Sequence, residues 1–494
     1  MTPEQITADV NLLAMKIQAR RADIRRHMDY FHGKQGKLAF ASDEFKRYMK
    51  ARFSGFSDNW CAPVAQAPVE RMHFQGLRPY NGDIMPASVA RRWDENDADR
   101  NLSEATLMMT IARRSYGLVT DNGHGKARIS FENPDSAAVL NDIRSGEPRV
   151  GLIIVQDDEN EYGTLFYPDV IFDVRRKKTA TTSDMRMPPD ISGWKFDPSS
   201  ERPNYLHAVP LVEFHNQCLL DDSPISDIES VESMQDTVNV VWSYLLNGLD
   251  YASLPARVIL GGDRLEEPVF DDKGEVVGAK PAELDKQVNE RILQLTGDVT
   301  IGEWSSSNLQ VFIPVIEKAV EHIAAETRTP GHYLLTNAEV PATGYEVAEA
   351  GLVSKTIERI GFMRKGVKEL NRLAALAEGD DISAKLIEDS EVVYANPQYR
   401  SQAVMTQALT HLKQTGFPLQ YIAEWFGLSP QEVERVARLK REEDADPEMT
   451  SLARVLIGDA DESTKSASLG SEDSRTPSTR PENDATDVEE NGRA

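Results

Sequence analysis

Residues 226–252 read SDIESVESMQDTVNVVWSYLLNGLDYA, and this stretch decides the fold. Its apolar residues recur every three or four positions, which predicts one apolar stripe along an α-helix. The stripe consists of Val231, Met234, Val238, Val241, Trp242, Leu245 and Leu249. Ser226 followed by Glu229 matches a capping box, so we expect the helix to begin directly after Ser226.

Two more helical stripes follow further along the chain. One runs from Leu309 to Ile323, with Ser306 or Ser307 as the expected N-cap and Thr329-Pro330-Gly331 as the expected end. The other runs from Val353 to Ala374. Between the first two helices, short segments rich in β-branched and aromatic residues predict strands, and a hairpin turn is expected at 271–274. The predicted strands are 256–260, 269–270, 275–277 and 299–304.

The N-terminal half combines both kinds of element. Apolar spacing predicts helices over 3–32 and 86–115, and a short helix over 134–145. Runs of Val, Ile, Phe and Tyr between turn residues predict four strands. These strands are 127–131, 149–156, 162–167 and 170–174. The chain is therefore predicted to be an α+β protein.

Composition excludes several classes of protein. The chain has 494 residues and a formal net charge of −25, whereas a protein that coats nucleic acid needs a net basic face. Two cysteines, Cys61 and Cys218, are too few for a disulfide scaffold or for a cysteine-based zinc or iron–sulfur site. No apolar run approaches the ~20 residues that span a bilayer. The N-terminus carries Glu4 and Asp9 and no apolar core, so we expect no signal peptide.

The last fifty or so residues differ from the rest. Residues 442–494 are acidic, rich in Ser, Thr, Asp, Glu and Pro, and almost free of aromatic side chains. Such a segment cannot bury enough apolar area to offset its ordering entropy, so we predict a disordered acidic tail. Leu452–Ile457 is a short apolar patch within it, suited to a helical turn or a docking peptide.

The sequence contains no recognised catalytic motif. It has no HExxH, no G-x-S-x-G and no P-loop, and its nine histidines include no i, i+4 pair. Residues 271–275 resemble a calcium loop only faintly, because Lys273 stands where a ligand oxygen is needed. We therefore predict no catalytic residue, no metal site and no cofactor. The basic run Arg175–Lys178 is interpreted as a solvated hairpin end.

Residues 418–441 have the spacing of a helix-turn-helix, with Gly427 at the turn. A DNA-reading second helix should begin with Arg, Lys, Asn or Gln, but this one offers Pro430, Gln431, Glu432 and Glu434. A compact helix–helix corner, with Gly427 as C-cap and Ser429 as the next N-cap, is the favoured interpretation.

The order of several short motifs resembles the portal proteins of tailed bacteriophages, in particular siphophages of actinobacteria. The resemblance covers about residues 1–441 and departs from the usual pattern at Ala256, where a polar residue is commoner, and in the acidic tail. The motifs are Tyr30–Lys34, Asn59–Trp60, Val69–Met72, Gly76–Leu77, Trp93–Asp97, Ser115–Gly117, Val209–Asn216, Ser226–Ile228, Gln235–Asn239, Tyr251–Arg257 and Gly261.

The resemblance implies a portal fold with a mixed α/β wing, a two-helix stem, a small β-rich clip and a helical crown. The implied parts are the wing 1–225, stem helices 226–252 and 306–330, the clip 253–305, the tunnel loop and long wing helix 331–395 and the crown 396–441; the predicted disordered tail 442–494 follows them. It also implies DNA-facing tunnel-loop residues, which are Asn337, Glu339, Val340 and Thr343, and stem or interface residues, which are Val238, Trp242, Phe312 and Ile316.

The function implied by the resemblance is structural, with no enzymatic activity. Such a protein forms a ring, typically of twelve copies, at one capsid vertex, and conducts double-stranded DNA during packaging and ejection. Implied partners are the terminase large subunit, the major capsid and scaffolding proteins and the head–tail adaptor, with no membrane; the ring is assembled in the host cytoplasm and stays in the virion. The alternative is a soluble hydrolase or transferase with a carboxylate active site and a helical C-terminal domain.

Overall fold

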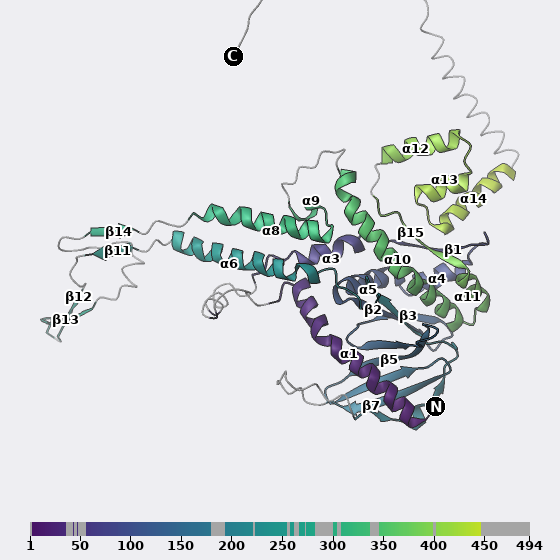
Figure 1. The fold of residues 1–494 in the computed structure, drawn as a ribbon, viewed down its shortest axis with the longest axis horizontal. Coiled ribbons are helices and arrows are strands. Elements are labelled where there is room, and N and C mark those ends of the chain that lie inside the picture. The colour runs from purple at the N-terminus through teal and green to yellow at the C-terminus, as the bar shows by residue number, and fades with distance from the viewer. Residues whose placement is uncertain are drawn as a thin grey trace, which may run out of the picture.

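The computed structural model describes residues 2–35, 43, 47, 56–178, 193–220, 223–253, 257–260, 266–271, 273–281, 300–303, 308–335, 345–398 and 402–445. Within them, a mixed α/β body carries a projecting pair of helices on one side and three short helices on another (Figure 1). The predicted α+β class is confirmed at this level. The predicted loop residues Asn337, Glu339, Val340 and Thr343 and nearly all of the predicted tail lie outside the described residues.

The centre of the body is a three-stranded antiparallel sheet covered by the longest helix. Its order is β10 (Leu211–His215), β2 (Arg114–Asp121) and β3 (Ala127–Glu132), and α10 (Tyr345–Ala377) packs on it. The helix lies unusually close to the strands. A Cβ atom on Gly366 would stand 2.4 Å from the Phe214 ring, and one on Gly117 would stand 2.8 Å from Leu370. Glycine at these two positions permits the close approach.

A second antiparallel sheet packs against the N-terminal helix. Its order is β4 (Ala137–Asn141), β5 (Pro148–Gln156), β6 (Asn160–Phe166), β7 (Val170–Lys177) and β8 (Lys195–Phe196); β9 (Arg202–Pro203) also pairs with β7, after the short η1 (Pro198–Ser200). Helix α1 (Pro3–Phe31) buries Ile6, Val10 and Leu13 against this sheet. The predicted helix 3–32 and the four predicted strands in this half are confirmed.

The predicted helix over 134–145 is wrong, because this region forms a turn followed by β4. Ala138 and Leu140 face the α1 core, whereas Ala137 and Val139 face the core around Leu211. A strand buried on both faces has no polar alternation, so its pattern cannot be distinguished from that of a short buried helix.

The region predicted as one helix over 86–115 contains two helices and the start of a strand. Helix α4 (Ala87–Glu95) ends before Asp97, which has φ of 50°, and α5 (Ala98–Ala112) follows. The left-handed conformation of Asp97 turns the chain sharply between them. Nearby, β1 (Phe74–Pro79) pairs with β15 (Ser390–Tyr394), and α11 (Asp381–Glu388) packs beside them, whereas α3 (Cys61–Val69) packs against α1, α5 and α10.

The basic run 175–178 agrees with its interpretation as a solvated hairpin end at three of its four residues and differs from it only at Arg176. It closes β7, and Arg175, Lys177 and Lys178 are exposed. The Arg176 guanidinium instead bonds to the Glu161 carboxylate and lies 4.7 Å from the centre of the Trp194 ring.

The two predicted helices of the projecting pair are confirmed, and Figure 1 shows them running side by side away from the body. They are α6 (Glu232–Ser253) and α8 (Phe312–Thr327), preceded by the short turns η2 (Glu229–Val231) and η3 (Leu309–Val311). At their far end lie two strand pairs, β11 (Arg257–Leu260) with β14 (Thr300–Glu303) and β12 (Glu266–Phe270) with β13 (Val276–Pro281). After α8, Arg328 caps the helix and α9 (Gly331–Leu334) turns the chain back.

The predicted capping box at Ser226 is wrong, whereas Ser306 and Ser307, the N-caps predicted for the second helix, lie outside the described residues. The Ser226 hydroxyl donates to the Ile111 carbonyl at 2.7 Å, and Glu229 pairs with Arg113, so no capping box forms and α6 begins six residues later than Ser226. At the second helix, the side chain of Asn308 caps η3 by accepting from the backbone N–H of Gln310.

The three C-terminal helices are α12 (Gln402–Gln414), α13 (Leu419–Phe426) and α14 (Pro430–Ala445). Gly427, with φ of 96°, ends α13, and Ser429 and Glu432 form a reciprocal capping box at the start of α14. Both caps of the predicted helix–helix corner are therefore confirmed.

Candidate functional site

Helix α6 is hydrogen-bonded to two segments from the N-terminal part of the chain. The Trp242 indole donates to Asp58 Oδ2 at 2.7 Å, and the backbone N–H of Trp60 donates to Gln235 Oε1 at 2.7 Å. From the end of α1, the Tyr30 hydroxyl donates to Asp236 Oδ2 at 2.9 Å. Side-chain bonds to residues more than 170 positions away thus fix the direction in which α6 leaves the body.

A buried ionic cluster lies just before α6. Asp227 accepts from Arg359 Nη2 at 2.8 Å and from Asn216 Nδ2 at 2.8 Å, and forms an ion pair with Lys355 Nζ at 3.0 Å. The side chains of Asp227, Lys355 and Arg359 are 1%, 5% and 4% exposed. Burial alone would raise the pKa of Asp227, but Lys355 and Arg359 hold it below its usual value. Burial likewise lowers the pKa of Lys355.

This cluster joins the projecting pair to α10. Lys355 and Arg359 belong to α10, whereas Asp227 precedes η2 and α6. Lys355 Nζ also donates to the carbonyl of Thr327, the last residue of α8, at 3.3 Å. Both helices of the pair are therefore tied to the central helix at one point. Asp227 thus pairs with two cations at once, and Glu358 lies 3.5 Å from Arg359 Nη1, so the cluster is suited to holding these elements in position.

A second buried pair lies on the α1 side of the base of α6. His27 is fully buried, its Nε2 accepts from Arg26 Nη2 at 3.2 Å, and it lies 3.5 Å from Glu232 Oε1. Burial, with Arg113 and Arg26 nearby, lowers the pKa of His27 to about 4. Burial also raises the pKa of Glu232 to about 7, and the carboxylates of Glu229 and Asp236 add to the effect.

These two shifts should act on stability in opposite directions. The folded pKa of His27 lies below its ordinary 6.5, so its contribution is present above about pH 6.5 and is lost as the pH falls towards 4. The folded pKa of Glu232 lies above its ordinary 4.5, so its contribution is present at low pH and is lost as the pH rises towards 7. Between about pH 4.5 and 6.5, His27 and Glu232 therefore change the free energy of unfolding with pH in opposite directions in the unmodified chain.

We expect single substitutions to reveal how each group changes the free energy of unfolding with pH. In Glu232→Gln, the free energy of unfolding should rise with pH between 4 and 6.5, with a slope of up to ~1.4 kcal/mol per pH unit relative to the parent. In His27→Gln it should instead fall between pH 4.5 and 7. Urea unfolding across this pH range measures both. Identical pH profiles for the two variants would contradict the opposed shifts.

The structure places the predicted interface residues mainly inside the chain. Val238 is 0% and Ile316 is 7% exposed, and both lie in the core at the base of the pair. Trp242 is held by Asp58, whereas Phe312 is half-buried. Their role between subunits stays a prediction. Large exposed apolar side chains on the pair lie elsewhere, at Tyr244, Leu249, Val311, Ile313 and Val315.

Sequence reasoning missed the ionic cluster, although a signal existed. Lys355 and Arg359 stand four residues apart, on the same side of the helix as the fully buried Leu352, Thr356 and Met363. Two cations at helical spacing among core positions require a buried carboxylate from elsewhere. The sequence alone does not say that this carboxylate is Asp227.

Two further kinds of site are absent from the described residues. No group of three or more His, Cys, Asp and Glu side chains in this part of the chain is placed to hold a metal ion. No helix among the residues that the structure describes is long and apolar enough to cross a membrane.

Comparison with known proteins gives a consistent result. The model of the family "Phage portal protein, SPP1 Gp6-like" matches residues 80–447. The portal protein of Mycobacterium phage D29 is 24% identical over 398 residues, which cover 76% of this chain and 77% of that protein. The portal protein of Mycobacterium phage L5 is 26% identical over 252 residues, which cover 49% of this chain and 50% of that protein.

Among solved structures, a chain from the neck of a native GTA particle computed with C12 symmetry is similar to this chain. It is 15% identical, with a TM-score of 0.41, and the match covers 80% of this chain and 96% of that one. A chain from the neck of an empty GTA particle computed with C6 symmetry matches at 14% identity with a TM-score of 0.41.

Proposed function

Because the chain belongs to the SPP1 Gp6-like family of phage portal proteins, we propose that it forms a ring at one vertex of a bacteriophage capsid and conducts double-stranded DNA through the centre. Portal function follows from the family, and portal proteins are components of the virion. The ring number, the division into parts and the partners are the proposed detail.

In the proposed division, α6 and α8 are the stem and the strands β11 to β14 are the clip. The body up to residue 225 and the long helix α10 form the wing, and α12 to α14 form the crown. The order of elements supports this division, because a helix, a β-rich insertion and a returning helix stand apart from the body (Figure 1). The predicted tunnel loop would connect α9 to α10.

The observation that carries the proposal is the apolar surface of the helix pair. Val311 is 60%, Ile313 49% and Val315 47% exposed on the α8 side, and Tyr244 and Leu249 of α6 are 40% and 44% exposed. In a cyclic ring, the neighbouring copy of the same chain would cover exposed apolar side chains of this kind.

The acidic composition suits a conduit. Twelve copies with a net charge of −25 each would carry about −300, and carboxylates near the channel would repel the DNA phosphates instead of binding them. DNA could then slide with little adhesion. ATP hydrolysis would belong to the terminase docked on the clip, and scaffolding protein, capsid protein and the head–tail adaptor would contact the outside of the ring. Assembly would take place in the host cytoplasm.

Light scattering coupled to size-exclusion chromatography tests the proposal. The purified full chain should elute as a ring of many times 55.1 kDa, and negative-stain images should show a central channel. A monomer or dimer at all concentrations, together with hydrolase or transferase activity, would favour the alternative function.

The tunnel-loop assignment gives a separate prediction. Glu339→Lys in every subunit would add a ring of cations beside the DNA phosphates, so packaging driven by terminase and ATP should slow or stall. Ring assembly should be unaffected. An in vitro packaging assay measures the rate, and Lys465→Glu in the predicted tail serves as a control charge reversal. Unchanged packaging at both low and physiological salt would show that Glu339 does not face the DNA.

A further inference from the structure

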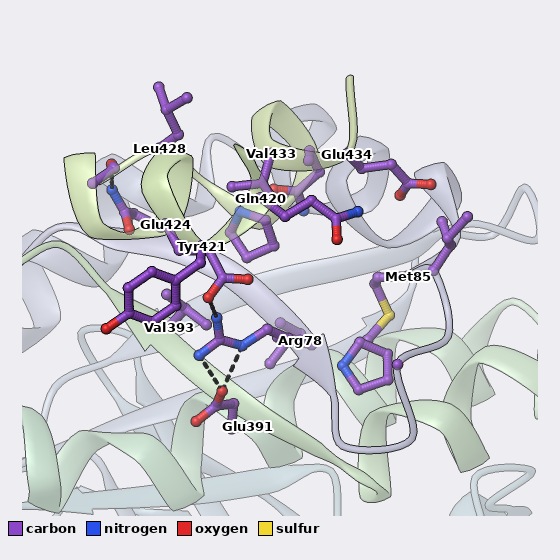
Figure 2. A pocket seen from close by; sticks show the side chains of 18 of the residues that line it. Arg78, Met85, Glu391, Val393, Gln420, Tyr421, Glu424, Leu428, Val433 and Glu434 are labelled. Carbon is purple, nitrogen blue, oxygen red and sulfur yellow. Dashed lines mark hydrogen bonds and ion pairs between the residues drawn. The ribbon is translucent and has the colours of Figure 1, made fainter. Parts of the chain in front are cut away.

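A cavity of about 920 Å³ lies between the β1–β15 sheet and the C-terminal helices. The residues 82–85 after β1 close one side, and α13 and α14 close another (Figure 2). Its volume falls in the range of about 300–1,000 Å³ that is typical of ligand pockets. Nothing in the proposed portal function uses this cavity.

The cavity wall mixes apolar and polar side chains, and its four carboxylates outnumber its two cations, Arg78 and Arg441. Met85, Val393, Tyr421, Leu428 and Val433 supply its apolar lining. Arg78 pairs with two of these carboxylates, with Glu391 at 2.6 Å and with Glu424 at 2.7 Å, as Figure 2 shows, and its charge offsets one of their two negative charges.

The remaining acidic residues of the lining are not neutralised in this way. Asp83 is exposed, and Glu434 of α14 is half-buried and forms no ion pair with another described residue. In Figure 2, Glu434 lies at the same end of the cavity as Met85. A suitable occupant is therefore an apolar segment that carries one positive charge.

One segment of this chain has that composition. Residues 446–494 follow α14, and Leu452–Ile457, with the sequence LARVLI, is the only cluster of apolar residues among them. Arg454, in the middle of this cluster, is the only Lys or Arg between 446 and 464. The apolar residues and the cation thus occur together in a tail that is otherwise polar and acidic.

The tether is long enough and begins in the right place. Arg441 of α14 lines the cavity, and the helix ends only four residues later at Ala445, about 6 Å further along its axis. The seven residues from Ala445 to Leu452 can span up to ~24 Å, which allows the chain to double back. A short tether also gives the segment a high effective concentration at the cavity.

We propose that Leu452–Ile457 docks in the cavity formed by β1, β15, α13 and α14 of its own subunit, with its apolar side chains against Tyr421 and Val433 and Arg454 beside Glu434. The proposal does not depend on the portal function. It identifies the cavity as an intramolecular docking site that anchors the start of the acidic tail.

Hydrogen exchange on the full chain tests the docking. Amides of 452–457 should exchange at least roughly tenfold more slowly in the parent than in Leu456→Asp, because exchange requires the segment to leave the cavity. The matched control Leu469→Asp makes the same change in the tail outside the segment and should leave these rates unchanged. Equal exchange of 452–457 in the parent and in Leu456→Asp would overturn the proposal.

Disulfide cross-linking identifies the occupant. Ile84 lines the cavity and is 60% exposed, so an Ile84→Cys, Leu456→Cys chain should form an intrachain disulfide on mild oxidation, seen as a shifted monomer band on a non-reducing gel. Ile84→Cys with Leu469→Cys is the control. A ladder of cross-linked multimers would mean that a neighbouring copy supplies the segment and would overturn docking within the subunit. Absence of any cross-link above the control would overturn docking altogether.

Charge reversal tests the pairing of Arg454 with Glu434. Arg454→Glu should reduce the yield of the intrachain cross-link several-fold, and adding Glu434→Lys should restore it. If neither change alters the yield, Arg454 is not beside Glu434 and the charge argument for this occupant fails.

Discussion

Replacing Asp227 with alanine is expected to destabilise the chain by about 3–5 kcal/mol, because two buried cations lose their carboxylate. Lys355 and Arg359 are almost completely enclosed, so bulk solvent cannot replace the negative charge of Asp227. Since typical domains are stable by only ~5–15 kcal/mol, most of the chain should unfold at a much lower urea concentration. Urea denaturation followed by circular dichroism measures the loss.

Two further variants show whether Asp227→Ala destabilises the chain by leaving unpaired buried charges or only by removing a contact. Glu321→Ala removes the carboxylate of an exposed pair with Lys318 on α8 and should change the stability very little. The triple variant Asp227→Leu, Lys355→Met, Arg359→Met removes the whole cluster and should recover much of the stability lost in Asp227→Ala. An Asp227→Ala variant as stable as Glu321→Ala would show that the cluster does not hold the helix pair to α10.

The second large effect concerns assembly. Val311 and Val315 are exposed and stand one helical turn apart near the start of α8. We expect Val311→Asp with Val315→Asp to abolish the ring, because every interface would bury at least two unpaired carboxylates at a cost of several kcal/mol. The folded monomer should tolerate both changes, since both side chains already face water. Light scattering reports the mass, and circular dichroism reports the fold.

The control for this prediction is Ile382→Asp. Ile382 is 83% exposed on α11, away from the helix pair, and its substitution should leave the ring intact. A full-size ring from the Val311→Asp, Val315→Asp chain would mean that α8 does not lie between subunits, and the proposed stem would have to be reassigned. Loss of the ring in both variants would point to a general effect of added charge.

The sequence by itself determined the elements whose signals are local. Helices α1, α6, α8 and α10 and strands β5 to β7 repeat apolar residues with periods of 3.6 or bracket them with turn residues, so their existence follows from short windows. The caps at Gly427 and Ser429 also depend only on neighbours. The family resemblance likewise followed from the order of motifs, and the family match later confirmed it.

Other features were decided by contacts between distant parts of the chain. Strand β4 is buried on both faces by α1 and by β10, and β1 pairs with β15 more than 300 residues away. Helix α6 begins later than its sequence predicts, because Ser226 and Glu229 bond to residues at the end of α5 and just after it. These bonds override the local capping preference. Asp227 became the centre of an ionic cluster only because α10 brings Lys355 and Arg359 against it. Short windows of sequence contain propensity and periodicity, but the partner of a buried group is chosen by packing, and packing exists only in the folded chain.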